Sequence, residues 1–245
     1  MIEMNKNYGA LILPAYNETE SIYELLLELD SKIPQDWHII VVDDSPSNDT
    51  EEFVRIARSM FVRDQLKLHL IRNPKKSGRG AAVQIGFSYA IENLKPSFLI
   101  EMDSDGSHTV ESLLLLIGVS EDEDFVIGSR YLKGSKIVGW PILRRAFSRL
   151  INFILRNTFR LNVFDWTNGL RRYSVKASLI QNRHQFLNSG FICLSEQILL
   201  LENHDIFPHE IPITFVDRTH GISTVTHMEI LKSLQGIVRL FLIWK

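Results

Sequence analysis

Short apolar runs that alternate with helical stretches constrain the fold of this chain more than any other feature of its sequence. Four of these runs come early and have the length of buried strands: residues 9–13, 37–42, 66–71 and 98–100. Pro14 ends the first run, polar or charged residues follow the other three, and most of the segments between the runs carry apolar residues on one helical face. Strands that alternate with helices favour a doubly wound sheet. We therefore expect an α/β fold with a mainly parallel, Rossmann-like sheet flanked by helices.

The composition permits a sizeable core and excludes several classes of protein. Hydrophobic residues make up 45% of the 245 residues, so we expect one folded domain over residues 1–245. The net charge of −2, with Lys and Arg spread widely, argues against a nucleic-acid-binding protein. The single cysteine, Cys193, cannot form an internal disulfide, and no apolar run resembles a signal peptide or a membrane span. These features favour a cytoplasmic protein, either soluble or peripheral on a membrane.

Carboxylates follow two of the predicted strands. Asp43 and Asp44 end the second run, and Asp103 and Asp105 come directly after the fourth. In an open α/β sheet, ligands bind beyond the carboxyl ends of the strands. Two hard oxygen ligands this close suit Mg²⁺ or Mn²⁺ together with the oxygens of a bound diphosphate. The alternative interpretation of Asp-Ser-Asp is a polar turn, since both residue types are common in turns.

A glycine pair precedes a helix that is predicted from residue 81 to about residue 92. Gly78 and Gly80 flank Arg79, but the third small residue of the dinucleotide-binding fingerprint is missing. No Gly-Lys-Ser/Thr sequence completes a P-loop either. A tight turn and a basic loop near a diphosphate therefore remain equally open for this segment.

The second half of the chain contains two amphipathic segments and one alternating segment. Residues 141–160 predict a helix with an apolar stripe and many arginines, which can face solvent or lie on an anionic membrane. Residues 210–216 alternate like an edge strand, because Pro212 would be unwelcome in a central one. Residues 228–244 form a mostly apolar tail, which could pack on the body or touch lipid.

Three of these segments resemble the motifs of family-2 glycosyltransferases of the GT-A fold. Residues 13–18, Leu-Pro-Ala-Tyr-Asn-Glu, resemble the opening nucleotide-binding loop of that family. Residues 42–45, Val-Asp-Asp-Ser, resemble its base- and ribose-binding turn, and residues 102–105, Met-Asp-Ser-Asp, are similar to its metal motif. Together they identify the broad superfamily.

Later segments resemble one branch of that family, the dolichol-phosphate or polyprenol-phosphate mannosyltransferases. Residues 128–131, Gly-Ser-Arg-Tyr, and residues 165–171, Asp-Trp-Thr-Asn-Gly-Leu-Arg, occur in the expected order. Residues 216–223 resemble the V-D-R-x-x-G-x-S segment of the branch. Thr224 departs from the pattern, because the family usually has Lys there. The departure removes a cation near the presumed phosphate site.

The resemblance implies metal-dependent, inverting transfer of a hexose, with mannose from GDP-mannose favoured, from a nucleotide sugar to a polyprenyl phosphate. The implied donor-binding residues are Pro14, Tyr16, Glu18, Asp43, Asp44, Gly80, Asp103 and Ser104. The implied ligands of Mg²⁺ or Mn²⁺ are Asp103, Asp105 and Ser107.

A lipid phosphate is already an oxyanion near neutral pH, so it needs positioning rather than a strong base. Arginines suit that task, since a guanidinium group pairs with phosphate in a fork. The expected catalytic residues are Asp105, Arg130, Arg144, Ser148 and Arg218. The resemblance also implies peripheral contact with the cytoplasmic face of a membrane, where a separate membrane protein could serve as anchor.

Three alternatives remain open from the sequence. The donor could be UDP-glucose or another UDP-sugar, because no rule applied to these motifs distinguishes guanine from uracil. The acceptor could be a soluble hydroxyl compound, which would require a general base such as Asp165 or Glu196. The chain could also bind nucleotide sugars without turnover.

Overall fold

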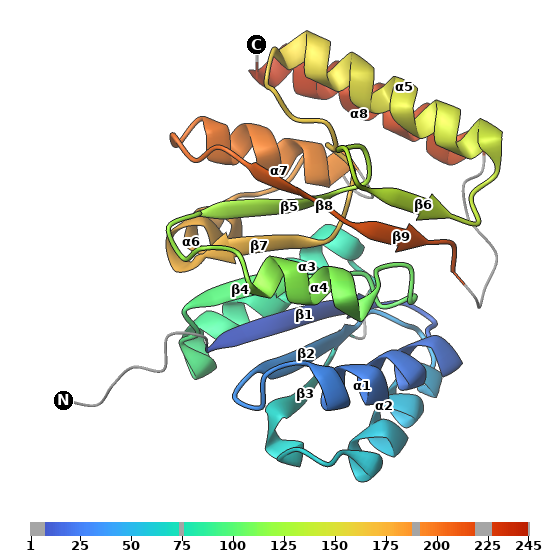
Figure 1. Cartoon of the computed structure of the whole chain (residues 1–245), viewed down its shortest axis with the longest axis vertical. Helices are drawn as coiled ribbons and strands as arrows, with labels where there is room; N and C mark the ends of the chain where they lie inside the picture. The colour runs from blue at the N-terminus through green and yellow to red at the C-terminus, as the bar shows by residue number, and fades with distance from the viewer. Residues whose placement is uncertain (1–7, 74–75, 188–191, 219–226, 245) are drawn as a thin grey trace.

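The computed structural model describes residues 8–73, 76–187, 192–218 and 227–244. Within these residues, seven strands form one sheet, in the order β3-β2-β1-β4-β7-β5-β8, and two more form a small parallel sheet, β6-β9 (Figure 1). The strands are β1 (Gly9–Ala15), β2 (His38–Asp43), β3 (Leu68–Arg72), β4 (Phe98–Glu101), β5 (Phe125–Ser129), β6 (Lys136–Val138), β7 (Arg171–Ser174), β8 (His209–Pro212) and β9 (Thr214–Val216). In the large sheet only β7 runs antiparallel to its neighbours, β4 and β5.

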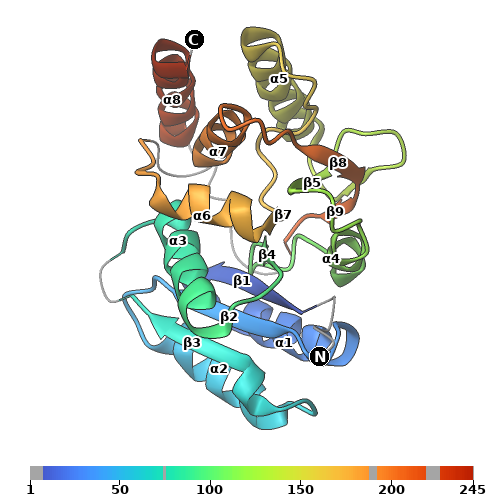
Figure 2. The ribbon, with the colours of Figure 1, turned by 90° about the vertical axis from the view of Figure 1, so that its left-hand side faces the viewer.

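Helices cover both faces of the large sheet. One face carries α1 (Glu20–Lys32), α2 (Asp49–Met60) and α4 (Val110–Ile117). The opposite face carries α3 (Arg79–Tyr89), α6 (Val175–Arg183) and α7 (Ile192–Glu202). Figure 2 shows α1 and α3 on opposite sides of the strands. This arrangement confirms the predicted α/β fold with a mainly parallel sheet flanked by helices.

The apolar runs become central strands because both of their faces are covered. Successive residues of β1 point to opposite faces, so Ile12 packs toward α3 while Leu11 and Leu13 pack toward α1. All three side chains are fully buried, which stabilises the fold by roughly 1.5–3 kcal/mol each.

Two long helices lie together at one end of the molecule, beyond α7: α5 (Ile142–Phe159) and α8 (His227–Trp244) (Figure 1). Ile151 of α5 and Leu240 of α8 join the core on the α3 side of the sheet. Leu143 and Leu242 remain largely exposed. The apolar tail therefore packs on the body with one face and leaves apolar side chains on the other. Among the described residues, no helix combines the length and hydropathy that crossing a bilayer requires.

The structure corrects two predicted elements. The single strand expected over residues 210–216 is two strands, because the chain steps between sheets at Ile213. The Ile213 N–H donates to the carbonyl of Ser129 in β5, the strand that pairs with β8. The Ile213 carbonyl accepts from the Lys136 N–H of β6. β8 is nevertheless the sheet edge that was predicted. The helix expected from residue 81 begins at Arg79 and continues beyond Tyr89 as a π-helical turn (Ala90–Leu94).

β7 is the element that the apolar pattern does not predict, since its sequence is Arg-Arg-Tyr-Ser. Arg171 and Arg172 point to opposite faces and are both buried, and each donates hydrogen bonds to backbone carbonyls. Arg172 binds the carbonyls at the end of α4, while Arg171 binds those of Trp166 and Asn168. This inserted strand therefore fixes the 165–170 loop next to the carboxyl end of β4.

Candidate active site

A cavity of about 460 Å³ lies beyond the carboxyl ends of β1 and β4. Loops from both halves of the chain line it, together with one face of α5. The structure brings together nearly all of the predicted site residues: Pro14, Tyr16, Glu18, Asp44, Asp103, Ser104, Asp105, Ser107, Arg130, Arg144, Ser148 and Arg218.

Asp43 and Gly80 are the two predicted donor-binding residues that do not line the cavity. Asp43 is fully buried, and it accepts hydrogen bonds from the Ser45 N–H at 3.0 Å and from Arg72 at 2.6 Å. Gly80 lies against Cys193, whose sulfur would be 3.2 Å from a side chain added at residue 80. The cavity is lined instead by Gly78 and Arg79 at this point. Asp43 supports the loops that line the cavity, and Gly80 permits close packing against Cys193.

Asp103 is held by a partly buried arginine at the start of α3. Arg79 Nε donates to Asp103 Oδ1 at 2.7 Å, and Arg79 Nη1 donates to Glu101 Oε2 at 2.8 Å. Burial raises the pKa of Asp103, but the charges of Arg79, His108 and Arg130 and the hydrogen bond from Arg79 together outweigh burial and lower it to about 2. Asp103 is therefore an ionised carboxylate at every working pH.

Asp105, two residues later, is paired with a cation from the other end of the chain. Arg218, which follows β9, places Nη2 3.2 Å from Asp105 Oδ2. The Ser107 N–H donates to Asp105 Oδ1 at 3.0 Å, so the backbone fixes the carboxylate orientation. The two carboxylates thus face one cavity, each with an arginine beside it.

The residues of the Asp-Ser-Asp segment suit a divalent cation. Asp103 keeps Oδ2 clear of Arg79, and the buried Nδ1 of His108 lies 3.9 Å from that oxygen without a hydrogen-bond partner. His108 Nε2 faces the Asn168 amide oxygen at 2.8 Å and donates to it. Asp103 Oδ2 and the Asp105 carboxylate are the hard oxygen ligands that this segment offers to a cation. Among the described residues no group of three His, Cys, Asp or Glu ligands gathers. The oxygens of a diphosphate would then complete the coordination.

Asp44 organises the loop before α3. It accepts from the N–H groups of Ser77 at 3.0 Å and Gly78 at 2.8 Å, and from the Asn73 amide at 2.7 Å. Gly78 has φ 87°, a conformation that strongly favours glycine. The segment is therefore a tight turn and also a basic loop beside the cavity, because the turn at Gly78 places Arg79 next to Asp103.

Tyr16 and Lys76 close the donor side of the cavity. Lys76 Nζ lies 3.6 Å from the centroid of the Tyr16 ring, a cation–π contact between two loops. Glu18 lies nearby, and burial raises its pKa, with the charge of Asp105 adding to the rise. Ser104 donates to the Pro14 carbonyl at 2.8 Å and joins the loops after β1 and β4.

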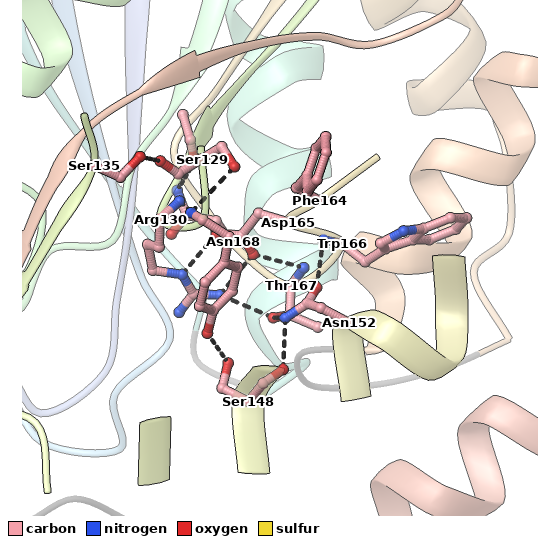
Figure 3. Close-up of polar contacts among 12 residues, drawn as sticks. Ser129, Arg130, Ser135, Ser148, Asn152, Phe164, Asp165, Trp166, Thr167 and Asn168 are labelled. Atoms are coloured by element: carbon pink, nitrogen blue, oxygen red, sulfur yellow. Dashed lines mark hydrogen bonds and ion pairs between the residues drawn. The ribbon is translucent and has the colours of Figure 1, made fainter. Parts of the chain in front are cut away.

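Arg130 is buried on the opposite side of the cavity. It donates to both oxygens of Asp165 at 2.8 Å and to the Thr167 hydroxyl at 2.9 Å (Figure 3). Its guanidinium carbon lies 5.3 Å from the ring centroids of both Trp140 and Phe215. Arg130 therefore presents an oriented positive charge between aromatic rings.

Arg144 and Ser148 project from one face of α5 into the same side of the cavity. Arg144 stacks on Trp140, with its guanidinium carbon 4.1 Å from the ring centroid, and donates to Asp217 at 2.8 Å. Ser148 accepts a hydrogen bond from the Tyr131 hydroxyl at 2.6 Å. The Ser148 hydroxyl proton is left to donate to a ligand.

The two general bases considered for a hydroxyl acceptor are not available. Asp165 is fully buried, does not line the cavity and is paired with Arg130 through both oxygens. Glu196 is also fully buried, outside the cavity lining, and it accepts from the Leu187 N–H and faces His184. The prediction that either acts as a base is therefore wrong for this structure.

Sequence reasoning assigned no definite role to four residues near the cavity carboxylates and arginines: Arg79, Glu101, Trp140 and Asp217. Glu101 carries a usable signal, since a charge within the buried run of β4 requires a buried partner. Arg79 is 22 residues from Glu101 and 24 from Asp103, so only the fold reveals the pair. Thr224 lies outside the described residues.

Comparisons with known proteins identify the family of this chain. Residues 10–179 match the family described as glycosyl transferase family 2. The chain is 30% identical to a polyprenol monophosphomannose synthase from Mycolicibacterium smegmatis, over 91% of this chain and 83% of that protein. It is 31% identical to an undecaprenyl-phosphate mannosyltransferase from Micrococcus luteus, over 88% of this chain and 86% of that protein.

Solved structures show the same fold. A glucosyl-3-phosphoglycerate synthase from Mycobacterium tuberculosis, in complex with Mn²⁺, UDP and phosphoglyceric acid, superposes with a TM-score of 0.67 at 14% identity, covering 96% of this chain and 78% of that one. A mannosyltransferase from Pyrobaculum calidifontis, in complex with GDP-Man and Mn²⁺, gives 0.62 at 15% identity, covering 94% of this chain and 61% of that one. The chain therefore belongs to glycosyl transferase family 2 and is a glycosyltransferase of the GT-A fold.

Proposed function

We propose that this enzyme transfers a hexose, mannose from GDP-mannose, to a polyprenyl phosphate. One observation carries the proposal. Asp103 and Asp105 lie on one side of the cavity, which would bind the donor. Arg130 and Arg144 lie on the other side, and the carboxylates beside them are already in ion pairs. Such a cavity suits two phosphate compounds, one that must leave and one that must attack. The names of the two bacterial relatives supply the sugar and the class of acceptor.

On the donor side, Asp103 and Asp105 would hold Mg²⁺ or Mn²⁺, which when bound neutralises charge on the leaving diphosphate. The loop that carries Tyr16 and the turn held by Asp44 would bind the nucleoside. Arg79 keeps Asp103 ionised and oriented throughout. The donor would therefore bind in a single orientation, with its anomeric carbon toward α5.

On the acceptor side, Arg130, Arg144 and Arg218 would orient the lipid phosphate, with the Ser148 hydroxyl as a further donor. The carboxylates beside them, Asp165 and Asp217, are already paired with Arg130 and Arg144. Positioning and desolvation of an existing oxyanion would then supply the rate enhancement.

Membrane attachment is part of the proposal. α5 lines the cavity with one face and exposes Leu143 and Phe153 on another, beside Arg149. α8 adds exposed Leu242 and Ile243 at the same end of the molecule (Figure 1). This surface would lie on the cytoplasmic face of an anionic membrane, where a polyprenyl phosphate presents its head group.

The test is transfer of radiolabelled sugar from GDP-mannose into an organic-extractable product, with dolichyl or undecaprenyl phosphate as acceptor. Parallel reactions with UDP-glucose and with soluble sugars separate the other donors and acceptors. Label that enters only water-soluble products would refute the lipid acceptor. Nucleotide-sugar binding without any transfer would refute the enzymatic role.

A further inference from the structure

Arg79 differs from the other cavity arginines in that it joins two carboxylates of β4 and the loop after it. Besides Asp103 and Glu101, its guanidinium donates to the Gly169 carbonyl at 3.1 Å. A side chain at residue 169 would collide with the Arg79 guanidinium and with both Asp103 oxygens, so glycine is required there. The loop before β7 thus closes over the Arg79–Asp103 pair.

Glu101, the second carboxylate that Arg79 contacts, is held by buried residues of the core. Glu101 is fully buried and accepts a hydrogen bond from the Tyr173 hydroxyl, which also contacts Gln197 at 3.2 Å. Gln197 in turn accepts from Arg171 at 2.9 Å. Buried polar groups therefore run without interruption from α7 to the cavity carboxylate. If Arg79 moved away, the buried Glu101 carboxylate would have no cation beside it.

We infer that Arg79 is a positioning residue that acts as a permanent cation of the diphosphate site. It occupies Asp103 Oδ1, so only Oδ2 remains for a metal ion, and it offsets one negative charge beside the leaving group. The inference deepens the proposed function and rests on it for the identity of the ligand. Its physical consequence is that a divalent metal alone binds weakly here, while a nucleoside diphosphate binds even before the metal.

The charges explain why the two affinities should move in opposite directions. Three carboxylates, Glu101, Asp103 and Asp105, share the site with two guanidinium groups, Arg79 and Arg218. Loss of Arg79 makes the site more negative by one charge, which attracts a cation more strongly and repels a diphosphate. A purely structural role would weaken both kinds of binding together.

The test compares Arg79→Met with the wild type by two binding measurements. Mn²⁺ alone is titrated by electron paramagnetic resonance, and GDP and UDP are titrated by calorimetry in EDTA. We expect Mn²⁺ to bind on the order of tenfold more tightly and the preferred nucleotide on the order of tenfold more weakly, because a charge-assisted contact has been lost. Arg79→Lys should restore both values toward those of the wild type.

Arg79→Met leaves Glu101 without its cation and could fail to fold. Arg79→Met is therefore also made in a Glu101→Gln background and compared with Glu101→Gln alone. A matched control is Arg63→Met, since Arg63 is buried and paired with Asp30 at 2.8 Å away from the cavity. That control should lower the thermal stability without changing either affinity.

Unchanged affinities, a parallel loss of both, or a wild-type protein that binds neither nucleotide in EDTA would overturn the inference. None of these measurements requires an acceptor or turnover. Failure of the proposed lipid-phosphate transfer would therefore leave this test intact, and failure of this test would leave the transfer reaction intact.

Discussion

Asp103 and Asp105 are one residue apart, yet the structure treats them differently. Asp103 is clamped by Arg79, which has only 14% of its side chain exposed and is itself fixed by Glu101. Asp105 is met by Arg218, at a longer distance of 3.2 Å and with 24% of that side chain exposed. Under the proposed function, the side of the cavity that binds the donor is a tightly paired network, and on the acceptor side we expect Arg218 to turn from Asp105 to an arriving phosphate.

The largest effect is expected at Asp105. Asp105→Asn keeps an oxygen for the Ser107 N–H but removes the charge that faces Arg218 and the metal site. Transfer should fall by roughly a thousandfold, because stabilisation of the leaving diphosphate by a metal is worth several kcal/mol. EDTA should abolish turnover of the wild type.

Initial rates of label transfer measure this effect, and circular dichroism with a thermal melt checks that the fold survives. Full turnover in a chelated sample, or an Asp105→Asn variant with normal rates, would show that transfer does not depend on a metal ion at Asp105.

Arg218→Ala tests the movable arginine. A charge-assisted hydrogen bond contributes about 1.5–3 kcal/mol, so transfer to a polyprenyl phosphate should fall by about tenfold to a hundredfold. Nucleotide-sugar binding, followed by calorimetry, should stay nearly unchanged. Arg55→Ala is the control, because Arg55 is exposed on α2, does not line the cavity and lies outside the proposed membrane surface.

If Arg218→Ala lost donor binding and kept its affinity for the acceptor, the assignment of Arg218 to the acceptor would be wrong. Arg79 and Arg218 would then both bind the donor, and the contrast between the two sides of the cavity would not hold.

The proposed membrane surface would extend the proposed acceptor side beyond the cavity. Leu143 is 84% exposed and Phe153 is 65% exposed on α5. Leu143→Glu together with Phe153→Glu should weaken binding to anionic liposomes by about tenfold or more, since each large apolar side chain contributes roughly 1.5–3 kcal/mol when buried. Flotation at low and high salt measures the binding.

Val62→Glu provides the control for this surface, because Val62 is 94% exposed near the end of α2, at the opposite end of the molecule. Equal flotation of the wild type and the double variant would exclude this face of α5 as a membrane contact.

Ser148→Ala should have the smallest effect. Its hydroxyl accepts from Tyr131 and offers one neutral hydrogen bond to a ligand, worth about 1 kcal/mol. We expect roughly a fivefold loss, seen in the KM for the lipid phosphate rather than in donor affinity. A change confined to donor affinity would move Ser148 to the donor side.

The mainly parallel sheet, and the edge of it at which the cavity lies, could be predicted from the sequence for physical reasons. Apolar runs of β1, β2 and β4 are buried on both faces, and polar residues at their carboxyl ends meet at one edge. β7 escaped prediction because its arginines are satisfied by carbonyls from α4 and the 165–170 loop rather than by water. The pairing of Arg79 with Asp103 was equally hidden, since it depends on which loops the sheet brings together.

The pairing of the acceptor-side carboxylates has a consequence for how the reaction should respond to pH. Asp165 and Asp217 already serve Arg130 and Arg144, so neither is poised to take a proton from an acceptor. A phosphate monoester loses its second proton near pH 6. The pH–rate profile should rise through that value and then level off, so the titration that kinetics records would belong to the lipid substrate and not to the enzyme.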